Sequence, residues 1–350
     1  IPEPVDPGSF NADEDFEQIL DEGRRSLDVK DFAAYQGVGK TEISWSGQGR
    51  DGSAAIPAAL HVLLVNILSS DSYSVNAVDG SSTPYEHWFR AGTTRKFLTI
   101  EHKQLGDALD REFKDCRVTE LVVKWNSGEG TLDYTATLTG QGATVAASTD
   151  LSATPGIPDI GVPHLGWEAG VIVNNIGSWT TATGLVAGWT RLISAEWTFR
   201  RSPPELFYSG QNQKTFADMY LPPLEVLCNM VIGYNEDSTA VDDASQMPTA
   251  FRAKNQALCL NSFQTGDDDA STNSRRIGFA ANKMDLGDGP MKFDTSGPST
   301  KLALVGRALY SDAAGTFTSE GNTNVVTAAL SMKSPVEISI ITPYATTLVS

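Results

Sequence analysis

Basic side chains are scarce in this sequence. Its 350 residues include 26 Lys and Arg against 43 Asp and Glu, which gives a formal net charge of −17 at pH 7. A protein that binds nucleic acid tightly normally neutralises phosphates with clustered Lys and Arg, so the charge balance argues against that class. Two interpretations stay open. The acidic surface serves solubility alone, or it lines a path along which a polyanion moves without sticking.

Long apolar runs are also absent. No stretch of 18 apolar residues occurs, and the longest apolar run, residues 56–68, is interrupted by Pro57, His61 and Asn66. That run is too short and too polar to span a bilayer. The first residues lack the basic and then apolar pattern of a signal peptide. We therefore expect no membrane partner and no secretion.

Only three cysteines are present, Cys116, Cys228 and Cys259, and no two of them have the CxxC spacing. Each lies in or beside an apolar run that is typical of a strand. Buried free thiols are therefore favoured over a disulfide framework or a metal site. A reducing compartment fits this pattern best.

Histidines are few as well, and they are far apart in the sequence: His61, His87, His102 and His164. None has an i, i+4 partner or a nearby cysteine, so a zinc site would require three distant loops to converge. A structural or surface role is favoured, with His61 on a helix with one exposed edge. The acidic groups at 267–269 and 285–288 do not match the twelve-residue calcium loop, and solvated turns are favoured.

Recognisable catalytic motifs are missing. No Gly-x-Ser-x-Gly elbow occurs, and a carboxylate pair for glycoside cleavage that is close only in space leaves no trace in a sequence. We expect no enzyme activity, no cofactor and no metal.

Residues 113–142 are predicted to form a long β-hairpin. Polar and apolar residues alternate with period two in its second half, and the turn at 126–130 contains two glycines that tolerate positive φ. The apolar positions are Leu132, Tyr134, Ala136 and Leu138, and the polar ones are Asp133, Thr135, Thr137 and Thr139.

Patterns elsewhere predict a β-rich chain with few helices. A capping-box pattern, Asn11 with Glu14, predicts a short helix before Gly23, and apolar spacings of three and four predict a core helix over 53–69. Residues 243–257 are predicted to form a second long helix, and 70–96 a long loop. Further strands are expected at 41–46, 97–102, 170–176, 185–199, 223–234, 258–263, 276–281, 302–310, 324–332 and 336–341.

Several segments together resemble the major tail tube proteins of long-tailed bacteriophages. They are the hairpin that begins near Asp115-Cys116-Arg117 and closes on Thr139-Gly140, the run 192–201 followed by 209–211, and the segment 307–310. The resemblance extends from about Tyr35 to Ile340. It implies a structural protein of the virion, assembled in the host cytoplasm, whose sheets join edge to edge in rings that stack into a DNA conduit.

The two halves of the chain show a similar order of strands and one predicted helix each. We therefore expect a mainly β (α+β) chain with two tandem tail-tube-like β-sandwich or barrel domains. The predicted divisions are an acidic N-terminal arm (1–30), a first domain (31–188) and a second domain (189–350). One large β-fold with an inserted helix is the alternative.

The resemblance also implies partners and a lumen wall. Two domains per chain would give a trimeric ring with pseudo-sixfold symmetry, and tape-measure and tail-terminator proteins and passing DNA would be further partners. The candidate lumen residues are Glu42, Glu120, Asp133 and Glu196. The alternative function is a β-sandwich module of a virion that binds a receptor or glycan. In that case exposed tryptophans among Trp88, Trp167, Trp179 and Trp189 would stack on sugars, whereas burial at a subunit interface is the favoured role for these residues.

Overall fold

The computed structural model describes residues 9–21, 33–50, 58–69, 74–77, 85–94, 96–102, 111–127, 130–142, 144–145, 161–166, 172–175, 192–208, 216–233, 256–265, 275–281, 284–285, 292–295, 301–310 and 335–342. Within these residues the protein consists of antiparallel β-sheets and one helix. The mainly β class is therefore confirmed.

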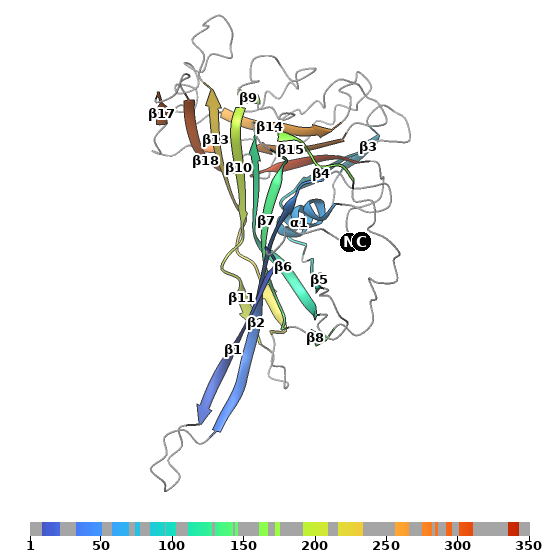
Figure 1. Ribbon diagram of the computed structural model, residues 1–350, viewed down its shortest axis with the longest axis vertical. Coiled ribbons are helices and arrows are strands. Elements are labelled where there is room, and N and C mark those ends of the chain that lie inside the picture. The colour runs from blue at the N-terminus through green and yellow to red at the C-terminus, as the bar shows by residue number, and fades with distance from the viewer. Residues whose placement is uncertain are drawn as a thin grey trace, which may run out of the picture.

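A large sheet of 11 strands forms one layer of the molecule (Figure 1). Its main path runs in the order β1-β2-β7-β6-β10-β13-β18-β16, while β5 and β8 pair with β6 and β17 pairs with β18. The strands are β1 (Asn11–Asp21), β2 (Ala33–Gln48), β5 (Leu98–His102), β6 (Arg111–Asn126), β7 (Asp133–Gly140), β8 (Thr144–Val145), β10 (Leu192–Arg200), β13 (Glu225–Gly233), β16 (Met284–Asp285), β17 (Lys292–Asp294) and β18 (Lys301–Ala308).

A second sheet crosses behind the upper part of the first (Figure 1). It has 6 strands in the order β3-β4-β19-β15-β14-β9, and a separate pair, β11-β12, lies at the lower end of the large sheet. The strands are β3 (Ser74–Ala77), β4 (Tyr85–Arg90), β9 (Ile172–Asn175), β14 (Gln256–Thr265), β15 (Arg275–Ala281), β19 (Glu337–Thr342), β11 (Glu205–Phe207) and β12 (Asp218–Tyr220).

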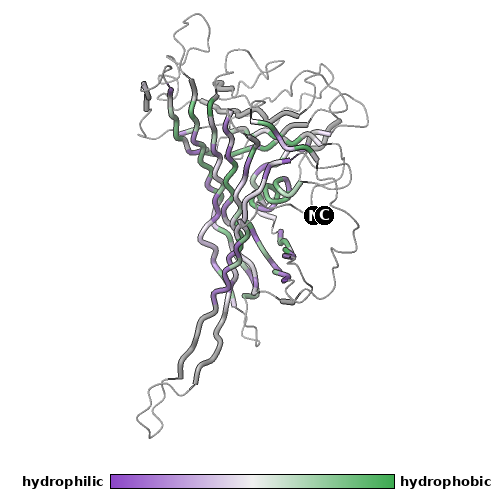
Figure 2. Tube along the Cα trace, in the orientation of Figure 1, coloured by the Kyte–Doolittle hydropathy of each residue, from purple (hydrophilic) through white to green (hydrophobic). Residues whose placement is uncertain are grey.

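The main core lies between the two sheets and around the helix α1 (Ala59–Leu68). Alternate residues of the large sheet point into it, so hydrophobic and hydrophilic colours alternate along its strands, whereas α1 is largely hydrophobic (Figure 2). The helix is buried almost all round, and it ends at Ser69, whose φ of 54° is left-handed. The Asn66 amide donates to the Lys96 carbonyl, and its oxygen accepts from the Val118 amide, which joins the helix to β6.

The structure confirms the hairpin at 113–142, the core helix within 53–69 and most of the other strands. The predicted helix before Gly23 is wrong, because residues 11–21 form strand β1 and pair with β2 from Asn11 opposite Ser44 to Asp21 opposite Ala33. A lone helix of about ten residues is marginal in water, whereas pairing with β2 satisfies backbone groups along the whole segment. The capping-box pattern was a local signal that this longer-range pairing overrode.

The predicted loop at 70–96 is wrong in part, because it contains β3 and β4, which extend the second sheet. The predicted helix at 243–257 lies outside the described residues except for Gln256 and Ala257, which begin β14. The predicted strand at 324–332 also lies outside them.

Both sheets cross the expected domain boundary near residue 188. In the large sheet β10 pairs with β6, and in the second sheet β19 pairs with β4. Hydrogen bonding thus joins the two halves within each layer, as the alternative of one large β-fold requires. The division into two tandem domains stays a prediction about the chain and does not coincide with a division between sheets.

Gly140 at the end of β7 permits a close approach to β6. A Cβ atom at this position would lie 2.4 Å from the Cys116 sulfur and 3.3 Å from the Lys114 carbonyl oxygen. We expect Gly140→Ala to lower the free energy of unfolding by about 1–3 kcal/mol through overpacking. Urea denaturation should show a smaller loss in a Cys116→Ala background, since the clashing sulfur is then absent. An equal loss in both backgrounds would contradict this explanation.

Candidate functional site: the polar face of the large sheet

One face of the large sheet packs on the core, and the opposite face is polar and faces solvent. The side chains of directly paired residues share a face, so strand register defines this surface, which we call the polar face. Its paired positions on five central strands are Ser44, Ser46 and Gln48 on β2, Thr137, Thr135 and Asp133 on β7, Glu120, Val122 and Lys124 on β6, Arg200, Thr198 and Glu196 on β10, and Glu225, Leu227 and Asn229 on β13.

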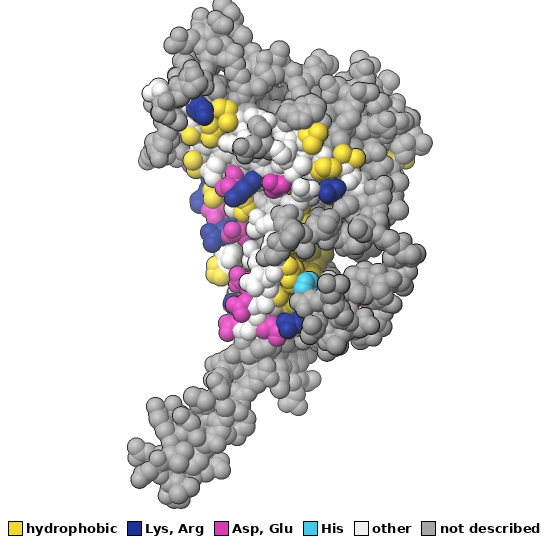
Figure 3. Space-filling view, in the orientation of Figure 1, with side chains coloured by type: hydrophobic (Ala, Val, Ile, Leu, Met, Phe, Trp, Pro, Cys, Tyr) yellow, Lys and Arg dark blue, Asp and Glu magenta, His cyan; other side chains and the backbone are white. Residues whose placement is uncertain are grey.

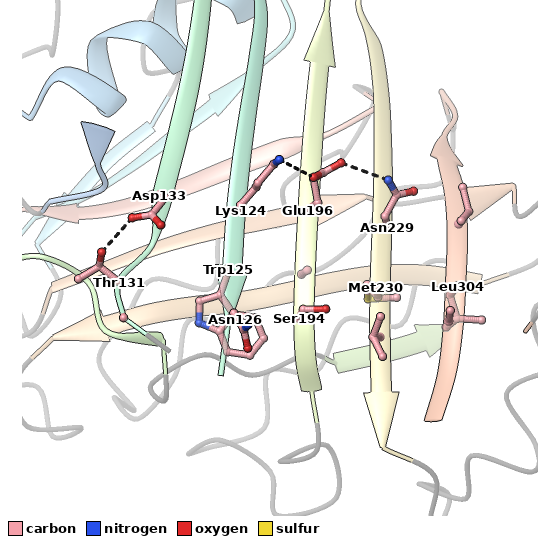
Figure 4. A pocket seen from close by; sticks show the side chains of 15 residues that line it. Lys124, Trp125, Asn126, Thr131, Asp133, Ser194, Glu196, Asn229, Met230 and Leu304 are labelled. Carbon is pink, nitrogen blue, oxygen red and sulfur yellow. Dashed lines mark hydrogen bonds and ion pairs between the residues drawn. The ribbon is translucent and has the colours of Figure 1, made fainter. Parts of the chain in front are cut away.

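One row of polar side chains crosses four of these strands. Lys124 lies opposite Asp133 and Glu196, and its Nζ is 3.3 Å from a Glu196 carboxylate oxygen. The Asn229 amide donates to the other Glu196 oxygen at 3.3 Å, and the Thr131 hydroxyl donates to Asp133 at 2.9 Å (Figure 4). The row therefore alternates in charge from strand to strand.

A second charged row lies further along the same strands. The Arg200 Nε is 3.3 Å from a Glu120 carboxylate oxygen, and Arg307 on β18 forms an ion pair with Glu225. Exposed pairs of this kind contribute about 0–1 kcal/mol each to stability. Their main effect is to hold each cation beside a carboxylate, so that none of these three cations, Lys124, Arg200 and Arg307, stands alone on the surface.

All four candidate lumen residues, Glu42, Glu120, Asp133 and Glu196, lie on the polar face. Strand alternation in the sequence was enough to find them. No local pattern indicates the cations that pair with two of them, because cross-strand partners depend on register between distant segments. Their position in a lumen stays a prediction.

Carboxylates outnumber cations on this face. Asp13 and Asp15 on β1 extend it beyond β2, since they lie opposite Glu42 and Lys40. Acidic and basic side chains are interspersed down the face in the space-filling view (Figure 3). The carboxylates at described positions of β1, β2, β7, β6, β10, β13 and β18 are Asp13, Asp15, Glu42, Glu120, Asp133, Glu196 and Glu225, and the cations are Lys40, Lys124, Arg200, Lys301 and Arg307.

A shallow groove of about 610 Å³ lies on the polar face where β7, β6, β10, β13 and β18 run side by side (Figure 4). Its charged lining residues are Lys124, Asp133 and Glu196, two of which are already ion-paired with each other. Trp125 also lines the groove, but only 3% of this residue is exposed. The groove therefore offers polar contacts but little aromatic surface for stacking.

Three of the four histidines lie close enough together to interact electrostatically. His61 on α1, His87 on β4 and His164 in the segment 161–166 are each buried. Burial, followed by the charges of His164 and His87, lowers the pKa of His61 to about 3. The expectation of an exposed edge on His61 is wrong. Folding brings distant segments together here, yet in the described part of the chain no three His, Cys, Asp or Glu side chains are arranged to hold a metal ion.

Cys116 and Cys228 are buried free thiols, as expected. Burial raises the pKa of Cys116 to about 12 and raises that of Cys228 as well, so neither is a reactive thiolate at neutral pH. The structure does not describe the Cys259 side chain.

Trp88 is a core residue, 3% exposed, so it cannot stack on a sugar. Trp167, Trp179 and Trp189 lie outside the described residues.

No helix in the described ranges is long and apolar enough to cross a membrane.

Comparison with known proteins gives no identification, since no protein-family description and no curated protein matches the chain. The geometry of the polar face therefore carries the functional argument alone.

Proposed function

We propose that this chain is the structural subunit of a phage tail tube, in which rings stack and the polar face of the large sheet lines a channel for DNA. The observation that carries the proposal is a broad antiparallel sheet that is packed on one face only. Its other face carries carboxylates, hydroxyls and ion-paired cations, with the apolar side chains of Val122, Leu227 and Val305 between them. A wall of this kind suits a polyanion that must pass without binding.

The electrostatics of the polar face explain why DNA would not adhere to it. Tight DNA binding requires cations that are free to displace counterions from phosphates. Lys124, Arg200 and Arg307 each lie beside a carboxylate, and the excess of carboxylates repels phosphate. Hydroxyl groups such as those of Ser46 and Thr135, whose oxygens are 3.0 Å apart, keep the wall hydrated without adding charge.

The edges of the large sheet supply the contacts that a ring needs. β1 is the terminal strand at one end of the order, and the other end carries only the short strands β16 and β17. These two pair with residues 307–308 and 301–303 of β18, so in the described structure the middle of β18 has no partner on that side. Unpaired strand edges invite pairing with another chain, and closure into a ring removes them.

Each chain supplies one continuous wall segment in this proposal, because the large sheet includes strands from both halves of the sequence. The ring would then contain one wall segment per chain. The trimer with pseudo-sixfold symmetry would instead need two equivalent wall segments per chain. Counting the chains and the wall segments in an assembled ring distinguishes these two arrangements. Tape-measure and tail-terminator proteins are the further partners that we propose for the tube.

Charge reversal on the polar face tests the conduit role. We expect lysine at Glu42, Glu120, Asp133 and Glu196 together to leave folding intact, because all four lie on the solvent-facing side of the sheet. Particles with this variant should eject DNA slowly, and its tubes should bind DNA in a salt-dependent way. Ejection kinetics and DNA binding at two salt concentrations are the measurements.

A charge swap is the matched control for this variant. Glu120→Arg combined with Arg200→Glu keeps both the net charge and the ion pair, so ejection should stay normal. Normal ejection by the four-lysine variant would show that the polar face does not line the channel.

Deleting residues 1–25 should prevent assembly, because it removes β1 and with it one edge of the large sheet. We expect sedimentation velocity to show only small species at concentrations where the intact chain forms tubes. Circular dichroism would verify that the β-structure persists. Tubes of normal length from the shortened chain would show that β1 is not needed for ring or stack contacts.

The alternative, a receptor- or glycan-binding module, is favoured by one observation, the groove on the polar face. Its charged and amide side chains could hydrogen-bond sugar hydroxyls. A glycan array probed with the intact chain and with Asn229→Ala would test this role.

A further inference from the structure

The two long edge strands of the large sheet, β1 and β18, run in the same direction. The path from β1 to β18 contains seven strands, and every neighbouring pair along it is antiparallel. The first and the seventh strand are therefore parallel to each other. Rotation about a ring axis does not invert a subunit, so β1 of one copy would meet β18 of the next as a parallel neighbour.

Strand register gives the offset between these two edges. One row of paired residues crosses the sheet from Asn11 on β1 to Glu225 on β13. Leu227, two residues further along β13, lies opposite Arg307 of β18. The row of Asn11 therefore reaches the chain just after the end of β18, at residue 309.

This offset agrees with the geometry of a closed barrel. Pairing Asn11 with Lys301 of the neighbouring copy requires a stagger of eight residues across seven strands. With roughly 3.3 Å per residue and roughly 4.8 Å per strand, this stagger corresponds to a strand tilt of about 38°. The strands of closed β-barrels are tilted by roughly 35–45°. A ring of such subunits would therefore bring the start of β1 beside the start of β18.

In the free subunit β17 covers part of the β18 edge. It pairs with residues 301–303, β16 pairs with 307–308, and in the described structure 304–306 have no partner on that side. β16 is anchored in the main core by Met284, which is 1% exposed, whereas β17 lies at the margin of the molecule (Figure 1). A pairing of only three residues is weak. If β17 leaves, residues 301–306 form an open edge of six residues.

β1 matches this open edge in length and in charge. Its pairing with β2 is regular over 11–16 and is then interrupted by a β-bulge, so its straight part also has six residues. Residues 13–15 are all acidic, whereas β18 contains Lys301 and Arg307 and no acidic residue. Pairing β1 with β1, or β18 with β18, would bring like charges together. Charge therefore favours the mixed pair, which a ring requires.

The faces of the two strands agree in the same register. Asp15 lies on the polar face, opposite Lys40, and Val305 lies on the polar face, opposite Asn229. With Asn11 beside the first residue of β18, Asp15 stands beside Val305. The polar face would then continue without a step from one subunit to the next. Val305 is 56% exposed in the free subunit, and the incoming strand would cover it.

We propose that residues 301–306 of β18 receive residues 11–16 of β1 from the neighbouring subunit as a parallel strand, and that β17 masks this edge until assembly. This inference rests on the proposed tube function, and it names the two edges that join and the element that separates them in the free chain. The open residues 304–306 offer the first contact. β1 then replaces the three-residue pairing of β17 with a pairing of six residues.

A reversible lock on β17 tests the masking. Lys292 lies directly opposite Ala303, and the Cα atoms of such antiparallel pairs are about 4.5–5.5 Å apart, which suits a disulfide. The chain with Lys292→Cys and Ala303→Cys should form no tubes when oxidised, at concentrations where its reduced form assembles. Electron microscopy and sedimentation velocity of the two forms are the measurements.

A second disulfide is the matched control for the lock. Ser46 on β2 and Thr135 on β7 are paired inside the sheet, with their hydroxyl oxygens 3.0 Å apart. The chain with Ser46→Cys and Thr135→Cys should assemble equally well when oxidised and when reduced. If the β17 lock behaved in the same way, β17 would be a permanent part of the sheet edge.

Weakening the hold of β17 should have the opposite effect. Asp294 lies opposite Lys301, so Asp294→Lys places two like charges in one cross-strand pair. We expect the concentration needed for assembly to fall by about two- to fivefold. Asp133→Lys changes the net charge equally but lies on β7, inside the sheet, and should leave this concentration unchanged. An equal shift in the two variants would show that net charge, and not β17, sets the threshold.

Disulfide trapping tests the contact between copies. A chain with Asp15→Cys is mixed with a chain carrying Val305→Cys and oxidised during assembly. We expect a mixed disulfide dimer, and none when Thr198→Cys, on the polar face of β10, replaces Val305→Cys. A dimer from the Val305→Cys chain alone would instead indicate a twofold contact between two β18 edges and would overturn the proposal.

The outcomes separate this proposal from the tube function. Tubes from the unchanged chain, with no mixed dimer and with normal assembly of the locked chain, would overturn the edge contact and leave the tube standing. A mixed dimer from chains that never form tubes would support the edge contact and overturn the tube. Neither mixed dimer nor tube would overturn both.

Discussion

Replacing Trp197 with alanine is expected to lower the free energy of unfolding by about 3–5 kcal/mol. Trp197 lies in the middle of β10, between Val123 of β6 and Cys228 of β13, and is 1% exposed. Its ring stacks on Phe279 of β15 at 5.7 Å between centres, so it joins the two sheets. Removing it leaves a cavity where the layers meet. Chemical denaturation followed by circular dichroism measures the loss.

Two matched variants isolate the cause of this loss. Trp197→Phe should cost less, because a ring still contacts Phe279 and because the Trp197 Nε1 is a buried donor with no hydrogen-bond acceptor in the described structure. Thr198→Ala, the next residue but on the polar face, should change stability by no more than about 0.5 kcal/mol. Equal losses for Trp197→Ala and Thr198→Ala would show that β10 is not packed between the sheets.

Acidification is expected to destabilise the fold steeply, with His61 as one cause. Its folded pKa is about 3 against an ordinary value of 6.5. Between these values the unfolded chain binds a proton at His61 and the folded chain does not, so the free energy of unfolding falls as pH falls. The slope is about 1.4 kcal/mol per pH unit from this residue. The stability is fully present above pH 6.5.

His61→Leu tests the assignment, since leucine fills the buried site without titrating. The variant should show a shallower loss of stability between pH 6.5 and 4 than the unchanged chain, measured by denaturant titration at several pH values. Identical slopes in the two chains would show that His61 is not a buried neutral histidine.

Local patterns in the sequence predicted the elements whose signals are themselves local. The hairpin at 113–142 and the helix α1 follow from alternation and from apolar spacings of three and four, and both are confirmed. Alternation also placed Glu42, Glu120, Asp133 and Glu196 on one face of strands, where the structure has them.

Features that depend on pairing between distant segments were beyond those patterns. The sequence of β1 has the pattern of a helix start, and only its pairing with β2 makes it a strand. The cluster of His61, His87 and His164 forms only when distant segments of the first half meet, and the pairs Lys124–Glu196 and Arg200–Glu120 form only when strands from both halves lie side by side.

Electron microscopy of the purified, negatively stained protein over a range of concentrations tests the tube proposal most directly. The proposal predicts hollow tubes or stacked rings with a stain-filled central hole, and the number of wall segments can be counted in end views. Compact particles that never stack, even at the highest concentration, would contradict it and would make the glycan-binding alternative the one to pursue.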